Sequence, residues 1–283
     1  MKHDACSVLN YIDLLSTRLQ SLGCRLQSNG FPILEPDWFL QSEPQHIVTY
    51  QKRNARYITD RTCTLLCFYS PDVNIYSRFD NIEQELPIYR EFMGVIAPDL
   101  TVTSDMDVEW QEAIILVNQL FIATLGIQGI KIVENLRIGG EESIECLNNF
   151  PPGVPCATST LGCQRTTSLA DTRFTEKLLA VRPSIVYLYG KEDTIMEHQL
   201  ELTGTPYLRF PDAHHELKKY YARVNHDSSF ANSLACFFND FTIYGNFYNQ
   251  WTKFIFRNAN RREEKSNGYA IGEDIAKNTH RQR

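Results

Sequence analysis

The chain has 283 residues, of which 43% are hydrophobic and 22% charged, and its formal net charge at pH 7 is −6. This composition is typical of a soluble globular protein with one large domain or two small ones, and its acidity argues against a dedicated nucleic-acid binder. No basic segment followed by an apolar run stands at the start, so we expect no signal peptide and a cytoplasmic location.

Residues 1–60 are expected to form an N-terminal helix and an irregular segment packed on the core. Residues 7–22 carry apolar side chains at helical spacing, which predicts an amphipathic helix. The proline-punctuated segment 31–45 is expected to wrap over the surface. A short strand could follow at 47–50.

From residue 63 onward, short apolar and β-branched runs alternate with helical segments. Continuous hydrophobicity fits strands that are buried on both faces, as in parallel sheets. Residues 61–225 are therefore predicted to be an α/β core with a mostly parallel sheet and βα repeats, either TIM-barrel-like or an incomplete barrel. An open doubly wound sheet is the alternative. The six runs are 63–70, 93–99, 130–135, 155–160, 185–190 and 206–211.

Two helices are predicted between these runs, at 108–126 and 171–181, from apolar side chains spaced three and four residues apart. Ser168 and Asp171 form a capping box before the second helix. The most apolar stretch, 113–127, is interrupted by polar residues, which favours a buried helix over a membrane span.

Polar residues follow the predicted strands, and in parallel α/β folds ligands bind beyond the carboxyl ends of the strands. We therefore expect a pocket there for a small anionic ligand, a nucleotide being one option. The sequence identifies no reaction, no cofactor and no metal. The candidate ligand-binding residues are Asp72, Asp99, Asp105, Asn135, Arg137, Thr160, Cys163 and Tyr189.

The candidates differ in how strongly they indicate a site. Arg137 could clamp an anion with two parallel donors, or could form an ion pair with Asp99, Glu134 or Glu141. Asp99 could orient a polar group or a divalent ion, or could cap a turn. Asp105 stands just before a helix, which favours an N-cap role.

Eight cysteines are present, and neither Cys63 with Cys67 nor Cys156 with Cys163 has the spacing of a zinc knuckle. We expect reduced, mostly buried thiols rather than a structural metal site. Cys163 could be a nucleophile activated by the following helix, but no base is near in sequence, so a structural role is favoured.

Residues 226–283 are predicted to be an aromatic extension with a basic tail. Ten aromatic residues lie within 230–256, and from Trp251 onward eight Lys and Arg stand against four acids. The aromatic segment could pack on the barrel as a helical extension, form an oligomer surface or stack on bases. The alternative function is a non-enzymatic nucleic-acid-associated or protein-interaction factor that acts through this extension.

Four motifs occur in order: "APDLTVTSDMD" (97–107), "NLRIGGEE" (135–142), "TLGC" (160–163) and "RPSIVYLYG" (182–190). Together they resemble an uncharacterised family from phages and other bacterial mobile elements, catalogued as a domain of unknown function. The resemblance covers about residues 85–225 and implies a mobile-element origin without an established activity. The chain departs from the family pattern at Thr103, Asp107 and Ile138.

Overall fold

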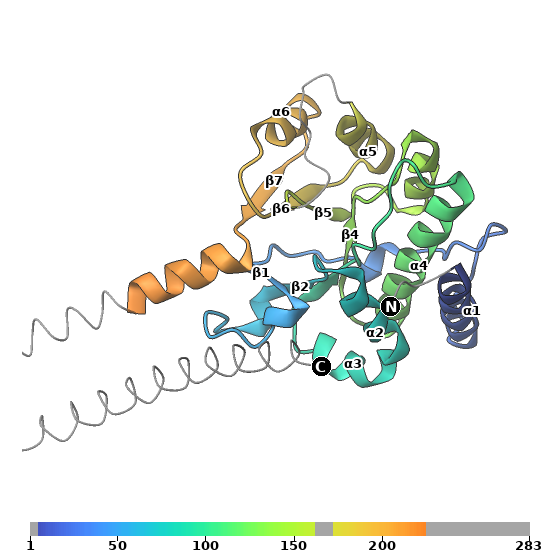
Figure 1. Ribbon diagram of the computed structural model, residues 1–283, viewed down its shortest axis with the longest axis horizontal. Helices are drawn as coiled ribbons and strands as arrows, with labels where there is room; N and C mark the ends of the chain where they lie inside the picture. The colour runs from blue at the N-terminus through green and yellow to red at the C-terminus, as the bar shows by residue number, and fades with distance from the viewer. Residues whose placement is uncertain (1–4, 162–171, 225–283) are drawn as a thin grey trace, which may run out of the picture. The chain divides into compact units, whose positions relative to one another are not determined.

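The computed structural model describes residues 5–161 and 172–224. Contacts divide the chain after residue 220, and the unit Met1–Tyr220 is built on a single sheet of seven parallel strands. The strands are β1 (His46–Thr49), β2 (Thr64–Cys67), β3 (Gly94–Ile96), β4 (Ile132–Asn135), β5 (Pro155–Ser159), β6 (Ile185–Tyr189) and β7 (Tyr207–Phe210). They lie in chain order and curl into a nearly closed barrel, whose seam lies between β1 and β7 (Figure 1).

This topology confirms the predicted incomplete parallel barrel. The strand order never reverses along the sheet, as it would in the doubly wound alternative. Successive side chains alternate between the barrel interior and the helical layer. Leu65 and Cys67 face the interior, whereas Leu66 packs under the helices. Both faces of the strands are buried, which explains why the runs are continuously apolar.

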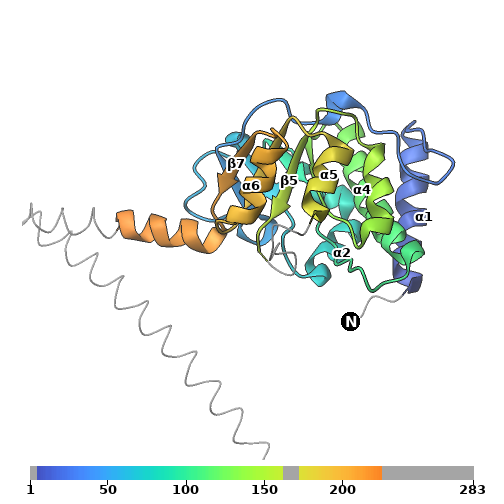
Figure 2. The same cartoon turned by 90° about the horizontal axis from the view of Figure 1, so that it is seen from above.

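Helices fill most connections between the strands and cover the outside of the barrel (Figure 2). The predicted helices at 7–22 and 108–126 are confirmed, and the one predicted at 171–181 is confirmed over Arg173–Val181. The capping box of Ser168 and Asp171 lies outside the described residues. The helices are α1 (Ala5–Ser21), α2 (Asp72–Asp80), α3 (Ile82–Tyr89), α4 (Val108–Ile127), α5 (Arg173–Val181) and α6 (Thr194–Leu202), with short 3-10 helices η1 (Pro36–Trp38), η2 (Tyr50–Lys52), η3 (Arg61–Cys63) and η4 (Glu141–Asn149).

Helix α4 is the central helix of the outer layer. Its length and composition would suffice to cross a membrane, but 72% of its apolar window is buried inside the fold. α1 packs along it, and both helices lie on the same side of the barrel (Figure 2). α4 is therefore a core helix, which is why apolar residues occur all around it.

The segment 31–45 is more buried than its prolines predict. Phe39 and Leu40 are almost fully buried, and the Leu40 N–H donates to the Ile132 carbonyl at 3.0 Å. Because Ile132 begins β4, this contact places the segment at the amino end of the barrel, where Leu40 joins the interior cluster. The expectation that this segment only wraps over the surface was wrong, because Phe39 and Leu40 are buried at the amino end of the barrel.

Arg182 ends α5 in a left-handed conformation, with φ 49° and ψ 59°. L-residues pay roughly 1–2 kcal/mol for this conformation, and glycine does not, although glycine loses more chain entropy on folding. We expect Arg182→Gly to stabilise the fold by about 0.5–1 kcal/mol, measured as a higher midpoint of urea unfolding. Arg182→Ala removes the same exposed side chain without relieving the backbone, and a matching gain from it would contradict this explanation.

Candidate functional site

Three of the predicted site residues meet at the carboxyl ends of β3 and β4. Asn135 is the last residue of β4, and its amide donates to the Asp99 carboxylate at 3.1 Å and to the Pro98 carbonyl at 3.2 Å. Two residues later, Arg137 turns back so that its Nε lies 3.6 Å from Asp99 Oδ1. The ion-pair alternative for Arg137 is therefore present, with Asp99 as the partner.

The guanidinium of Arg137 is only partly satisfied by these neighbours. Its side chain is 14% exposed, and Nη2 makes a long hydrogen bond of 3.4 Å to the Val102 carbonyl. Nε is buried and donates to no acceptor among the described residues, because 3.6 Å exceeds hydrogen-bond distance. A guanidinium has five N–H donors, and buried donors are normally paired. Arg137 thus keeps donor capacity that residues 5–161 and 172–224 do not use.

A small cavity of about 10 Å³ lies beside this cluster. Besides Asp99, Asn135 and Arg137, its walls come from the carboxyl end of β5 and the residues that follow, including Ser159 and Leu161. A space of this volume holds about one water-sized group. It can receive one atom of an acid group but is far smaller than a site for a whole nucleotide.

Tyr69 lies at the same end of the barrel and was not among the site residues predicted from the sequence. Its ring stacks on that of Tyr189, with centroids 5.4 Å apart, and its hydroxyl is buried without a hydrogen-bond partner among the described residues. Burial, together with nearby Cys67 and Asp99, raises the pKa of Tyr69 well above its usual range. The hydroxyl therefore keeps its proton. Side chains alternate along a strand, so Tyr69 could have been expected to face the barrel interior together with Leu65 and Cys67.

Thr160 and Tyr189 are neighbours, but their polar groups are already engaged. The Thr160 N–H donates to the Tyr189 carbonyl at 2.9 Å, and the threonine hydroxyl donates to the Lys191 carbonyl at 2.7 Å. The Tyr189 hydroxyl accepts from the Ala213 N–H at 3.0 Å. Both residues hold the loops at the carboxyl end in place.

Asp72 and Asp105 form no hydrogen bond or ion pair with Asp99, Asn135 or Arg137 in the described part of the chain. Asp72 begins α2 and accepts from the N–H of Thr101 at 3.2 Å and from its hydroxyl at 3.0 Å, which ties α2 to the loop after β3. Asp105 is exposed, and a hydrogen bond from the Thr103 side chain lowers its pKa. The N-cap expectation for Asp105 was wrong, because α4 begins at Val108 and Asp107 is its N-cap.

The cysteines and histidines of the described residues form no metal-binding group. Five cysteines are free thiols, four of them buried, and Cys163 lies outside the described residues. No group of three His, Cys, Asp or Glu within the described ranges could hold a metal ion. Asp212 accepts from the N–H groups of His214 at 2.8 Å and His215 at 3.0 Å, so it caps the helix that follows β7, and its second oxygen lies 2.7 Å from His215 Nδ1.

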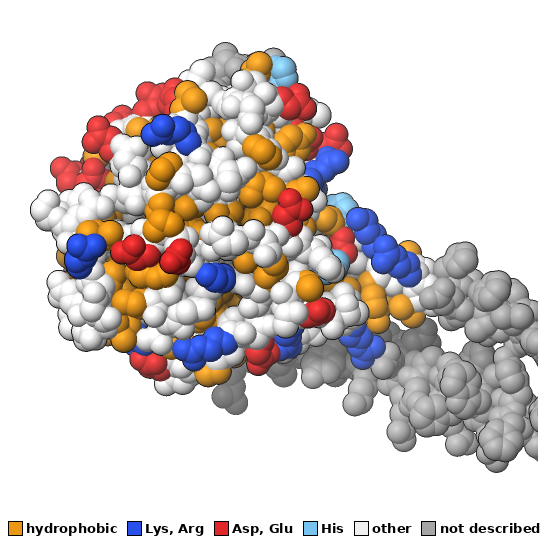
Figure 3. Space-filling model, turned by 180° about the vertical axis from the view of Figure 1, so that it is seen from behind, with side chains coloured by type: hydrophobic (Ala, Val, Ile, Leu, Met, Phe, Trp, Pro, Cys, Tyr) orange, Lys and Arg blue, Asp and Glu red, His pale blue; other side chains and the backbone are white. Residues whose placement is uncertain are grey.

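Charged side chains of both signs are interspersed on the face shown in Figure 3. This view of the described residues offers no continuous basic surface of the kind that nucleic-acid binding requires. The aromatic segment 230–256 and the basic tail lie outside the described residues.

Comparison with protein families shows a match over most of the described core. A family model described as "Domain of unknown function (DUF4417)" matches residues 26–211, which is more than half of the chain and includes all seven strands. No curated protein and no solved structure matches the chain.

Proposed function

Since the chain belongs to the family described as a domain of unknown function (DUF4417), we propose from its own geometry that it binds a small anionic ligand at the carboxyl end of the barrel. The observation that carries the proposal is the buried Nε of Arg137, which has no acceptor among the described residues, while the guanidinium lines a small cavity. The carboxyl ends of parallel strands are where α/β barrels bind their ligands.

The cluster offers both donors and acceptors to such a ligand. Arg137 supplies charged donors in a partly desolvated setting, where a bidentate hydrogen bond to a carboxylate or phosphate is strong. Asp99 and Asn135 fix the position of the guanidinium and can accept from a ligand hydroxyl. Because the cavity holds only one water-sized group, an oxygen of the acid group occupies it and the rest of the ligand lies beyond.

The test uses Arg137→Lys, which keeps the charge but loses the planar fork. We expect inorganic phosphate or a nucleoside monophosphate to raise the thermal midpoint of the wild type above that in NaCl of equal ionic strength. Arg137→Lys should weaken this binding about tenfold or more, with little change in the ligand-free midpoint. Arg209→Lys is the matched control, because Arg209 is a more exposed arginine on β7 that pairs with Glu192 and Glu197.

A purely internal ion pair predicts a different pattern. Removing Arg137 would then leave Asp99 partly buried without its cation and would lower the ligand-free midpoint strongly. If Arg137→Lys and Arg137→Ala both unfold early while the remaining folded protein binds phosphate as the wild type does, the proposal fails.

The proposal extends to the origin of the protein and to its cellular location. The motif resemblance supports an origin in phages or other mobile elements. The free thiols, four of them buried, support a reducing compartment such as the cytoplasm. The alternative factor role depends on residues 230–256, and the described residues supply no observation in its favour.

A further inference from the structure

The cavity beside Arg137 contains an acceptor as well as donors. Asp99 lines this cavity together with Arg137, and its side chain is 21% exposed. One carboxylate oxygen, Oδ1, accepts from the Asn135 amide at 3.1 Å, whereas the other forms no hydrogen bond with any described residue. A purely cationic pocket accepts many anions, so a carboxylate in its wall selects against some of them.

Asp99 and Arg137 are paired too loosely to use up each other's hydrogen-bonding capacity. Arg137 Nε and Asp99 Oδ1 lie 3.6 Å apart, which is close enough for an ion pair but beyond hydrogen-bond distance. The bidentate hydrogen bonds that often join arginine to a carboxylate are therefore not formed. One oxygen of a ligand's acid group can accept from Arg137 while a neighbouring oxygen of the same group faces Asp99.

Thr158 provides a second donor at this cavity. It lies on β5, is 7% exposed, and lines the cavity. Its hydroxyl forms no hydrogen bond with any residue in the described ranges. Buried polar groups are normally paired, yet this hydroxyl and the Arg137 Nε both lack acceptors among the described residues. Two such donors, from the ends of different strands, point to a ligand group that is rich in acceptors.

Lys177 adds positive charge close to the same cavity. It lies on α5 and is 6% exposed, and its ammonium group donates to the Leu136 carbonyl at 3.1 Å. Leu136 is part of the cavity wall. A second cation therefore lies near the cavity, which favours a negatively charged ligand even though Asp99 is present.

The carboxylate of Asp99 sets a chemical condition on that ligand. An ionised carboxylate accepts hydrogen bonds but cannot donate one. An oxyanion without a proton would place a negative oxygen against Asp99, and this juxtaposition of like charges is costly. An oxyanion that still carries a hydrogen can donate it to Asp99 while its other oxygens accept from Arg137 and Thr158. Inorganic phosphate keeps a proton at neutral pH, whereas sulfate, which has the same tetrahedral shape, keeps none.

We propose, building on the proposed function, that this site selects a phosphate group in a protonated form and rejects sulfate. The P–OH group donates to Asp99, and the unprotonated oxygens accept from Arg137 and Thr158. Inorganic phosphate is the simplest such ligand, and a phosphate monoester binds as its monoanion.

The test compares inorganic phosphate with sulfate by calorimetric titration of the whole chain at pH 7 and constant ionic strength. We expect the wild type to bind phosphate about tenfold or more tightly than sulfate. In Asp99→Asn the amide can donate to an unprotonated oxygen, so the ratio of the two affinities should fall to about threefold or less. Asp105→Asn is the matched control and should keep the wild-type ratio, because Asp105 is exposed and does not line the cavity.

Thr158→Val tests the second donor, because valine has a similar shape but no hydroxyl. It should weaken the binding of phosphate and of sulfate alike, by about three- to tenfold, and leave their ratio unchanged.

The wild-type titrations separate this inference from the proposed function. Equal binding of phosphate and sulfate would overturn the selectivity and leave the anion site standing, whereas binding of neither would overturn both. A phosphate preference that persists undiminished in Asp99→Asn would assign the selection to another group and would also overturn the inference.

Discussion

Glu134→Gln is expected to raise the thermal midpoint of the protein above that of the wild type at pH 7–8, with almost no difference near pH 4.5. Glu134 lies in β4 and is 4% exposed, and its Oε2 has no hydrogen-bond partner among the described residues. Burial raises the pKa of this carboxyl well above its ordinary value of 4.5. The folded protein therefore holds a proton that the unfolded chain releases.

The sign of the pH dependence follows from this proton. Above pH 4.5 the unfolded state binds fewer protons than the folded state, so the free energy of unfolding falls as pH rises. While Glu134 stays protonated in the fold, each pH unit removes about 1.4 kcal/mol. The side-chain amide that replaces the carboxyl in the variant cannot ionise, so this loss disappears. The effect at pH 8 should exceed that of Arg182→Gly.

The measurement is the thermal midpoint of both proteins between pH 4.5 and pH 8. Glu142→Gln, which changes an exposed glutamate of η4, should run parallel to the wild type. A buried glutamine amide can itself be destabilising if it finds no partner. Glu134→Met is therefore a second variant, because Glu134 pairs in the sheet with Cys156, which belongs to the hydrophobic core. Parallel pH profiles for Glu134→Gln and the wild type would show that the carboxyl is ionised in the fold.

The sequence predicts the strand that contains Glu134, but it does not predict that this glutamate is buried. The runs that became strands were visible because strands buried on both faces are rich in apolar residues, and "IKIVEN" contains Ile130, Ile132 and Val133. Nothing local distinguishes Glu134, which is buried, from Glu141, which is exposed. Neighbouring strands and helices decide this difference, and they are distant in sequence.

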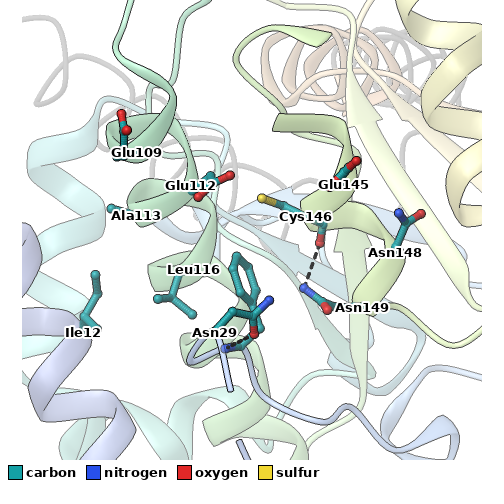
Figure 4. A pocket seen from close by; sticks show the side chains of 11 residues that line it. Ile12, Asn29, Glu109, Glu112, Ala113, Leu116, Glu145, Cys146, Asn148 and Asn149 are labelled. Atoms are coloured by element: carbon teal, nitrogen blue, oxygen red, sulfur yellow. Dashed lines mark hydrogen bonds between the residues drawn. The ribbon is translucent and has the colours of Figure 1, made fainter. Parts of the chain in front are cut away.

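Part of the candidate site was predictable from the order of the strands. Asp99 and Arg137 could be expected together because adjacent parallel strands end at one edge of the barrel. The sequence could not reveal that the Thr160 hydroxyl donates to the Lys191 carbonyl and that the Asp72 carboxylate accepts from the Thr101 N–H. The pocket between α1, α4 and η4 (Figure 4) could not be predicted, because Ile12, Glu112 and Glu145 become neighbours only when α1 and η4 pack on α4.

Gly190→Ala is expected to be the most destabilising substitution at the carboxyl end of the barrel. Gly190 follows β6 with φ 130°, a conformation that residues with a side chain rarely adopt. A Cβ atom there would lie 2.5 Å from Thr160 Oγ1 and 2.8 Å from Leu161 Cγ. Backbone strain and collision therefore act together, and we expect a loss of about 2–4 kcal/mol in the free energy of unfolding.

Gly153→Ala separates these two contributions. Gly153 also has a positive φ, 77°, but its Cβ would meet nothing within 4 Å, so only the backbone cost of about 1 kcal/mol applies. Denaturant titrations of both variants give the difference. Because Leu161 also lines the cavity beside Arg137, displacing it should weaken phosphate binding in whatever fraction of Gly190→Ala remains folded. Equal losses in the two variants would mean that Thr160 and Leu161 move aside freely, and that these two residues do not hold the anion site in shape.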